Sequence, residues 1–237
     1  MSLILGIETA TKICSVAISR DGELLSIKEI GGEYSHSENL NHFIELACVE
    51  AKINLNQLDA IAVSKGPGSY TGLRIGVSTA KGLCYGLDKP LIAVDTLKAM
   101  AKGLIMSQLH TLLFGEGKGG ALFCPMIDAR RMEVYTAIYN AKFELVEPIS
   151  AKIMDEHSFV HFLENNKIVF FGDGAEKCKS LLNNHPNAVF IGNVEPSAKY
   201  VNQLAVEKFN NREFEDVAYF EPYYLKEFLA TTPKNKR

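Results

Sequence analysis

The sequence predicts an α/β fold made of two similar lobes, each with a three-stranded meander plus helices. Strand-like and helix-like segments alternate along the whole chain of 237 residues. The order of these segments restarts after residue 119, and residues match between the two halves at equivalent points. The matches are Ile7-Glu8 with Ile127-Asp128, Ala17-Ile18 with Ala137-Ile138, and Gly66-Pro67-Gly68 with Gly172-Asp173-Gly174. Because they occur in the same order in both halves, they indicate a duplication.

The first half is expected to begin with a buried strand at Leu3–Ile7. Two further strands follow, joined by a hairpin turn at Asp21-Gly22. Helices are expected where apolar residues recur at helical spacing, and one of them ends near Gly86. The expected segments are 3–7, 14–19, 24–30, 36–53, 60–64, 71–87, 91–94 and 96–106.

The second half repeats this order after a connection at residues 107–119 that is rich in glycine towards its end. Its final helix has Ser197 as a plausible N-cap. The expected segments are 122–127, 134–139, 143–149, 155–165, 168–171, 174–182, 189–191 and 197–209. We therefore expect an N-terminal lobe of residues 1–106 and a C-terminal lobe with a tail, residues 107–237.

The composition narrows the class of protein. The net charge is −3, so the chain lacks the basic bias of a protein that grips RNA by itself. The five cysteines are scattered without a CxxC pair, which is typical of small buried residues in a reducing cytosol. The N-terminus runs straight into a strand, and the uncharged stretch 103–115 is too short to span a bilayer. We expect a cytoplasmic protein with no membrane contact.

The segment Gly66–Gly76 carries the strongest local signal. Gly66 and Gly68 permit backbone angles that other residues avoid, and Ser69 and Thr71 can cap the helix that follows. The N-terminus of such a helix suits an anion. The spacing nevertheless differs from a Walker A loop and from a Rossmann fingerprint. A tight turn without a ligand therefore stays open as the alternative.

The helix after this turn has small residues at every fourth position. Gly72, Gly76 and Ala80 form one smooth stripe. Because glycine inside a helix costs roughly 1 kcal/mol against alanine, close approach of another helix would explain the pattern. That helix could belong to a partner protein, or the stripe could pack on this chain's own sheet.

Polar residues follow the first strand of each half. Two lobes of this plan resemble the actin-like ATPase superfamily. In that superfamily, ligands bind between the lobes. An acidic residue at the first hairpin helps to hold the nucleotide and its metal ion. Glu8, Thr9 and Lys12 occupy that hairpin here. In the second half the equivalent hairpin holds Asp128 and Arg130, where Arg130 could pair with Asp128 or meet an anion.

No catalytic set stands out in the sequence. His157 and His161 have the i, i+4 spacing of a zinc pair, but the buried face of their expected helix lies elsewhere, so we interpret them as solvated. No serine or cysteine nucleophile set is evident. We therefore expect neither a catalytic residue nor a metal site.

Four segments together resemble the TsaB/YeaZ family. The segment Gly66–Gly76 resembles its GPGSFTGLRIG motif, with Tyr70 where phenylalanine is usual. Residues 5–11, 127–135 and 221–226 match further motifs of the family in the same order. The resemblance spans nearly the whole chain. Glu8 departs from the more usual aspartate, which keeps the charge but lengthens the side chain.

The resemblance implies a non-catalytic subunit required for threonylcarbamoyl modification of the tRNA adenosine beside the anticodon. Such a subunit forms a heterodimer with the catalytic subunit TsaD and supports the ATPase TsaE, so tRNA is contacted through the complex. TsaD carries a His-x-x-x-His metal pair, and the aligned positions here are Thr96 and Met100. A hydroxyl and a thioether cannot replace two imidazoles on a zinc or iron ion.

Two sets of site residues follow from these considerations. A nucleotide or anion is expected, if at all, at Glu8, Thr9, Lys12, Gly66, Gly68, Ser69 and Thr71. The resemblance implies a partner interface at His36, Leu40, Gly72, Arg74, Gly76, Thr79 and Ala80. We expect no cofactor to be required by this chain, with weak ATP or ADP and magnesium at the cleft or the partner junction as an open alternative. A homodimer of the isolated chain is also compatible with such a surface.

Two rival functions remain open from the sequence. One is a small-molecule kinase or ATPase of the actin-like fold, suggested by Glu8, Lys12 and the two Gly-x-Gly turns. The other is a metal-dependent glycoprotease, which would need a bound metal.

Overall fold

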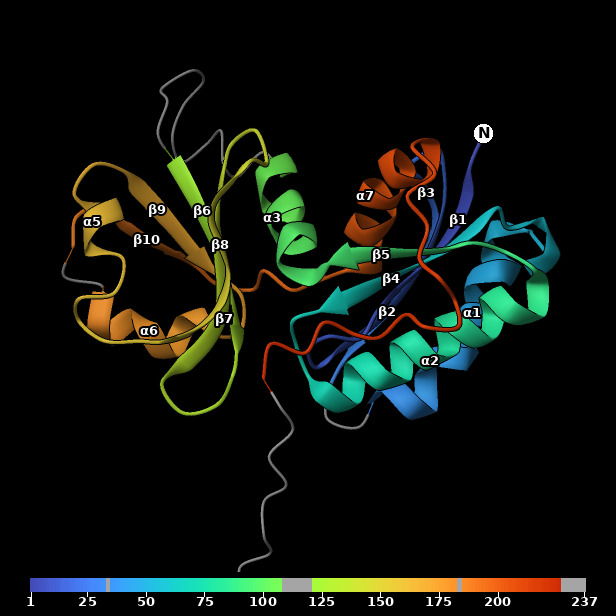
Figure 1. Ribbon diagram of the computed structural model, residues 1–237, viewed down its shortest axis with the longest axis horizontal. Helices are drawn as coiled ribbons and strands as arrows, with labels where there is room; N and C mark the ends of the chain where they lie inside the picture. The colour runs from blue at the N-terminus through green and yellow to red at the C-terminus, as the bar shows by residue number, and fades with distance from the viewer. Residues whose placement is uncertain (33–34, 108–120, 183–184, 227–237) are drawn as a thin grey trace, which may run out of the picture.

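The computed structural model describes residues 1–32, 35–107, 121–182 and 185–226. These residues form two mixed five-stranded sheets that lie side by side, with helices around each sheet (Figure 1). The α/β class and the two-lobed actin-like plan predicted from the sequence are confirmed.

The first sheet is centred on the N-terminal strand. Its strands are β1 (Leu3–Glu8), β2 (Ile13–Arg20), β3 (Glu23–Gly31), β4 (Ala60–Gly66) and β5 (Leu91–Asp95). The order across the sheet is β3-β2-β1-β4-β5, with β1 antiparallel to β2 and parallel to β4. All six residues of β1 are buried, as expected for a central strand that is covered on both faces.

The second sheet repeats this arrangement. Its strands are β6 (Ala121–Asp128), β7 (Glu133–Asn140), β8 (Leu145–Ile153), β9 (Lys167–Phe171) and β10 (Ala188–Ile191). The order is β10-β9-β6-β7-β8, which read from the other end is the order of the first sheet. In both sheets the first strand of the lobe is central and pairs with the next strand in antiparallel fashion. The predicted duplication is therefore confirmed at the level of strand topology.

The helices are α1 (Ser35–Ala51), α2 (Tyr70–Leu87), α3 (Thr96–Met106), α5 (Val160–Leu163), α6 (Ala175–Leu182) and α7 (Ala198–Asn210), with a 3₁₀ turn η1 at Leu55–Gln57. Helices α1 and α2 pack on the first sheet and contact one another along the edge of the molecule (Figure 1). Ser197 caps α7 by accepting a hydrogen bond from the Lys199 backbone nitrogen, as predicted. All five cysteines are free and buried, also as predicted.

Two helices pack on the sheet of the other half of the chain. Helix α7 comes after the second sheet, yet it covers β1, β2, β4 and β5 of the first sheet. Val201 and Ala205 lie in one core cluster with Ile4, and the Asn202 amide donates to the Ala17 carbonyl oxygen at 3.0 Å. The prediction that all of residues 107–237 belongs to the second lobe is therefore wrong for α7. The division at residue 106 itself stays a prediction.

Helix α3 of the first half packs on the second sheet in a similar way. It follows β5 but packs on β6 and β7 as well as on β4 and β5. Leu97, Met100 and Leu104 share a core cluster with Phe123 and Phe171 of the second sheet. Helices α3 and α7 thus join the two lobes through buried apolar surface. Burial of such surface is the main favourable contribution to folding.

The amphipathic helix expected at 155–165 is largely absent. Only Val160–Leu163 is helical, because Phe159 adopts a left-handed backbone angle (φ 63°) and Asp155 accepts a hydrogen bond from the His157 backbone nitrogen at 3.0 Å. His157 and His161 therefore do not lie one turn apart on a shared helix.

Candidate functional site

The glycine turn joins β4 to α2 at the edge of the first sheet. Gly66 ends β4 with φ 115°, a conformation that favours glycine, and the Gly66–Pro67 peptide bond is cis. Ser69 is the N-cap of α2, because its Oγ accepts a hydrogen bond from the Gly72 backbone nitrogen at 3.3 Å. The helix thus begins at Tyr70, one residue before the predicted start.

The turn is packed directly on the residues that follow β1. The Ser69 backbone nitrogen donates to the Ala10 carbonyl oxygen at 2.6 Å, and the Thr9 hydroxyl donates to the Gly72 carbonyl oxygen at 2.8 Å. A Cβ atom on Gly68 would lie 2.3 Å from the Ala10 oxygen, and one on Gly72 would lie 2.1 Å from the Thr9 oxygen. These glycines therefore allow two backbones to approach closely, and their role is packing.

The small-residue stripe faces the interior of this chain. A Cβ atom on Gly76 would lie 2.2 Å from Thr9 Oγ1, and Ala80 is fully buried. Leu40 of α1 is also buried, with 2% of its surface exposed. The predicted partner interface is therefore wrong for Leu40, Gly72, Gly76 and Ala80, because a docking partner cannot reach side chains that pack on this chain's own sheet. Among the remaining members of that set, Arg74 is exposed while Thr79 and His36 are half-buried.

His36 connects the first turn of α1 to the same hairpin. Its Nε2 lies 2.7 Å from the Thr11 carbonyl oxygen, and its ring lies beside Gly72. Burial lowers the pKa of the ring. A neutral His36 can donate from Nε2 to the Thr11 oxygen, so this side chain helps to fix the Thr9–Lys12 loop.

Glu8 is fully buried at the end of β1. Its Oε1 accepts a hydrogen bond from the Ala10 backbone nitrogen at 2.6 Å, and its Oε2 has no partner among the described residues. Burial raises the pKa of Glu8 from 4.5 to about 7. A hydrated magnesium ion with a nucleotide needs an ionised carboxylate that solvent can reach. Glu8 in this arrangement does not fit that role.

The predicted anion-binding residues differ in how far solvent can reach them. Glu8, Thr9 and Gly66 are buried, Gly68 is half-buried, and Lys12, Ser69 and Thr71 are exposed. At the glycine turn the Ser69 backbone nitrogen is already bonded to the Ala10 oxygen, and Tyr223 of the C-terminal segment lies against Gly66. The nucleotide or anion site expected at these residues stays a prediction.

The segment above the turn is residues 211–226, here called the C-terminal strap. The Tyr223 backbone nitrogen donates to the Lys65 carbonyl oxygen at 2.7 Å, which places the strap against Gly66. Lys81 of α2 donates to the carbonyl oxygens of Ala218 (3.1 Å) and Phe220 (2.9 Å). The strap is therefore fastened to α2 at Ala218 and Phe220 and to the end of β4 at Tyr223.

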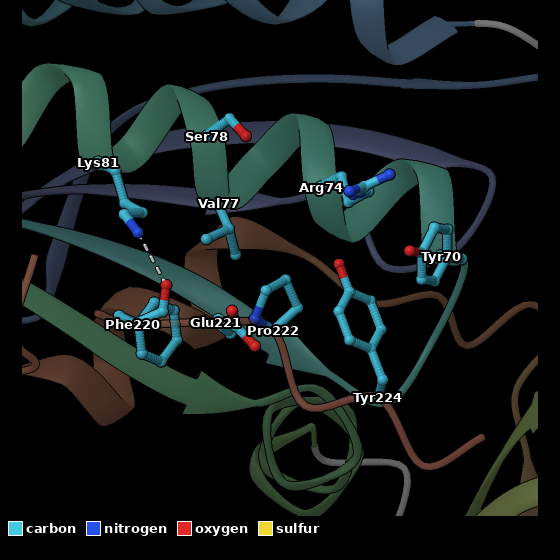
Figure 2. Close-up of a pocket in the computed structure, with 9 residues that line it drawn as sticks. All are labelled: Tyr70, Arg74, Val77, Ser78, Lys81, Phe220, Glu221, Pro222 and Tyr224. Carbon is cyan, nitrogen blue, oxygen red and sulfur yellow. Dashed lines mark hydrogen bonds between the residues drawn. The ribbon is translucent and has the colours of Figure 1, made fainter. Parts of the chain in front are cut away.

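A groove of about 320 Å³ lies between α2 and the C-terminal strap (Figure 2). Tyr224 of the strap lies 4.7 Å from Tyr70 between ring centroids, and the Arg74 guanidinium lies 5.0 Å from the centre of the Tyr70 ring. The lining residues are Tyr70, Arg74, Val77, Ser78, Lys81, Phe220, Glu221, Pro222 and Tyr224. In the sequence, this region was indicated by the motif at residues 221–226 and by the segment Gly66–Gly76, which contains Tyr70 and Arg74.

The outward surface of α1 and α2, here called the outer helix face, exposes several apolar side chains. Val49 of α1 is 75% exposed and Tyr85 of α2 is 87% exposed. Gly82 and Gly86 are also exposed, and a Cβ atom on either would meet nothing within 4 Å. No packing within the described residues therefore requires glycine at these two positions.

This second glycine pair was missed in reading the sequence, although a signal for it exists. Gly82 follows Gly76 by six residues, which corresponds to a rotation of about 240° around a helix. The two pairs must therefore lie on different faces of α2, and only one of them can face the sheet.

Neither a metal cluster nor a membrane helix is evident in the described residues. Within residues 1–32, 35–107, 121–182 and 185–226, no group of three or more His, Cys, Asp or Glu side chains is arranged to hold a metal ion. Thr96 and Met100, the positions aligned with a metal pair, are buried in α3. In the same residues, no helix combines the length and the apolar character needed to cross a membrane.

Residues 31–232 match the family model described as TsaD, tRNA N6-adenosine threonylcarbamoyltransferase. The chain belongs to this family. A tRNA threonylcarbamoyladenosine biosynthesis protein TsaB from Haemophilus influenzae is 29% identical over 94% of this chain and 93% of its own length. A transferase of the family from Staphylococcus haemolyticus is 38% identical, but only over 39% of this chain and 32% of its own length.

A solved structure shows the same fold over the whole molecule. YeaZ from Pseudomonas aeruginosa has a TM-score of 0.77 at 24% identity, and the match covers 95% of this chain and all of that one. The match to the transferase from Staphylococcus haemolyticus is thus partial, whereas the match to TsaB from Haemophilus influenzae is nearly end to end. Within the family, the chain therefore belongs to the TsaB/YeaZ branch.

Alanine at two glycines of α2 is expected to have opposite effects on stability. Gly72→Ala should lower the free energy of unfolding by about 1–3 kcal/mol, because its Cβ would collide with the Thr9 carbonyl oxygen. Gly82→Ala should raise it by about 0.5–1 kcal/mol, because the site is open and alanine favours the helix. Urea unfolding of both variants measures this difference. Equal effects would contradict the assignment of faces.

The buried Glu8 is expected to make stability depend on pH. The folded chain binds the Glu8 proton up to about pH 7, whereas an unfolded glutamate releases it near pH 4.5. Its contribution is therefore fully present below about pH 4.5 and is lost as the pH rises to about 7, by about 3 kcal/mol in all. The difference in unfolding free energy between the wild type and Glu8→Gln, measured from pH 4.5 to 8, should follow this curve. A flat difference would refute the buried protonated state.

Proposed function

We propose that this chain is a non-catalytic scaffold subunit for threonylcarbamoyl modification of the tRNA adenosine next to the anticodon. It acts by forming a heterodimer with a TsaD homologue and by supporting a TsaE homologue, and it works in the cytoplasm. The observation that carries the proposal is the nearly end-to-end similarity to a protein named for tRNA threonylcarbamoyladenosine biosynthesis. The buried Thr96 and Met100, at the positions of the TsaD metal pair, support a role other than catalysis.

The closed glycine turn also favours assembly over chemistry in this chain. Glu8 is buried, and its Oε1 accepts a hydrogen bond from the Ala10 backbone nitrogen. Under the proposal the chain requires no cofactor of its own. Any ATP or ADP with magnesium binds between the lobes or at the junction with the partner, away from the glycine turn.

The outer helix face is the surface that we assign to the TsaD homologue. It lies on two adjacent helices and combines exposed apolar side chains with two glycines that let another backbone come close. Arg74 and Thr79 of the predicted interface lie on the same helix, while Val49, Gly82 and Tyr85 replace the buried members of that set. The same face could pair with a second copy when the partner is missing.

No observation favours the rival functions. An actin-like kinase would need its metal-holding acid open between the lobes, and Glu8 is enclosed. A metal-dependent glycoprotease would need a ligand set, and the described part of the chain brings no such residues together.

Reconstitution tests the proposed function directly. The purified chain should make no modified tRNA when it is supplied with ATP, threonine and bicarbonate. Addition of the TsaD and TsaE homologues and a threonylcarbamoyl-adenylate synthase should restore modification, and omission of this chain should abolish it. Mass spectrometry of nucleosides from digested tRNA provides the measurement. Modification by this chain with the synthase alone would refute the scaffold role.

A charge on the outer helix face should weaken the heterodimer. Val49→Glu should lower the affinity for the TsaD homologue by roughly tenfold or more, because a carboxylate would be buried in an apolar contact. Ile153→Glu on β8 is the matched control, since Ile153 is equally exposed at 75%. Calorimetric titration measures both affinities. Equal affinities for the two variants would place the interface elsewhere.

A further inference from the structure

The hairpin between β6 and β7 presents two consecutive arginines in an unusual backbone conformation. Arg130 has φ 68° and Arg131 has φ 48°, so both lie in the left-handed region. The turn is closed by hydrogen bonds from the Ala129 nitrogen to the Glu133 oxygen (3.1 Å) and from the Glu133 nitrogen to the Arg130 oxygen (3.2 Å). Arg130 and Arg131 are here called the arginine tip.

The residues of the arginine tip go against the local backbone preference. Two consecutive left-handed residues in a hairpin favour Asn-Gly, Asp-Gly or Gly-Gly. The same chain uses Asp21-Gly22, with φ 50° and 84°, in the hairpin between β2 and β3. Where a sequence departs from such a rule, the residues that it keeps are candidates for function.

The tip is held in place by the elements around it. The Asp128 backbone nitrogen donates to Asp173 Oδ1 at 2.9 Å, and Asp128 Oδ1 accepts from the Arg130 backbone nitrogen at 2.8 Å. Lys177 of α6 pairs with the same Asp128 carboxylate and donates to the Glu133 carbonyl oxygen at 2.7 Å. The turn is therefore fixed before any ligand arrives.

Two of the acidic groups beside the tip, Asp128 and Glu133, are paired with lysines. Lys177 pairs with Asp128, and Lys226 of the C-terminal strap pairs with Glu133. The open alternative from the sequence, an Arg130–Asp128 ion pair, is therefore not formed. Arg130 and Arg131 are both exposed, and neither guanidinium makes an ion pair within the described residues. Two positive charges thus stand uncompensated on a chain of net charge −3.

We propose that the arginine tip binds phosphate groups of the RNA backbone and gives this chain a direct contact with tRNA. The inference rests on the proposed function, which makes tRNA the polyanion of the complex. Guanidinium groups bind phosphates in bidentate fashion and position RNA without reading its sequence. The protein partner is assigned to the outer helix face of the first sheet, which leaves the tip on the second sheet for nucleic acid.

Salt-dependent titration of the heterodimer tests this contact. Unmodified tRNA is titrated into the heterodimer carrying the wild-type chain or Arg130→Gln/Arg131→Gln, at several potassium chloride concentrations. The double variant should bind more weakly, and the slope of log affinity against log salt should become smaller by about 1.5, as expected for two lost phosphate contacts. Arg212→Gln is the matched control, because Arg212 is also exposed with a left-handed backbone (φ 57°) but lies after α7.

A second variant separates binding from folding. Arg130→Asn/Arg131→Gly installs residues that the turn prefers, so the thermal midpoint should rise by roughly 2–4 °C. The affinity of this variant for tRNA should still fall to that of Arg130→Gln/Arg131→Gln. Unchanged tRNA affinity and salt slope in both variants would overturn the proposal. Loss of heterodimer formation with unchanged tRNA binding would overturn it as well, because the tip would then contact a protein.

Failure of the proposed function gives a different result. If the wild-type chain forms no heterodimer with the TsaD homologue, the scaffold role fails while the tip can still be tested. The same titrations are then made on the chain alone at low salt. Weaker tRNA binding by the two tip variants than by Arg212→Gln would support the contact, whereas no binding or equal binding would overturn it.

Discussion

The contact between the glycine turn and the backbone after β1 is the constraint on which the rest of the first lobe depends. The Ser69 nitrogen and the Thr9 hydroxyl join the two segments by short hydrogen bonds, and the glycines leave no side chain between them. Because Gly72 and Gly76 must face the hairpin, the rotation of α2 about its axis is fixed. The exposed positions of Gly82 and Tyr85 are a consequence of that rotation, so one backbone contact defines both the core and the outer helix face.

Two further features hold this contact from below and above. Glu8 lies beneath the hairpin and accepts a hydrogen bond from the Ala10 nitrogen, while the C-terminal strap lies over Gly66 and is tied to α2 by Lys81. The resemblance of the sequence to actin-like ATPases implies an acid at the end of the first strand that helps hold a metal–nucleotide. Here it is enclosed, and burial raises its pKa to about 7. The same position therefore serves to support the loop in this chain.

The repeated order of strands and helices could be predicted because each half carries its own local signals. The surface that each helix faces could not be predicted in the same way. Helical spacing shows that Gly72, Gly76 and Ala80 share a face, yet it does not tell whether that face meets the sheet or a partner. The apolar residues of α7 predict an amphipathic helix without specifying which sheet it covers, and only the contacts with Ile4 and Ala17 decide this. The left-handed Phe159 has no local signal that would have shortened the expected helix.

The duplication explains how one fold presents two different surfaces. The second lobe repeats the close backbone contact, since a Cβ atom on Gly172 would lie 2.3 Å from the Met126 oxygen and the Gly174 nitrogen donates to that oxygen at 3.0 Å. The helix after the first turn has 18 residues, whereas the helix after the second has 8. The long helix supplies an apolar face suited to a protein. The short helix brings Lys177 to the hairpin and leaves two arginines exposed, which suits a polyanion. The shared contact thus fixes each scaffold, while helix length and hairpin residues determine what each lobe can bind.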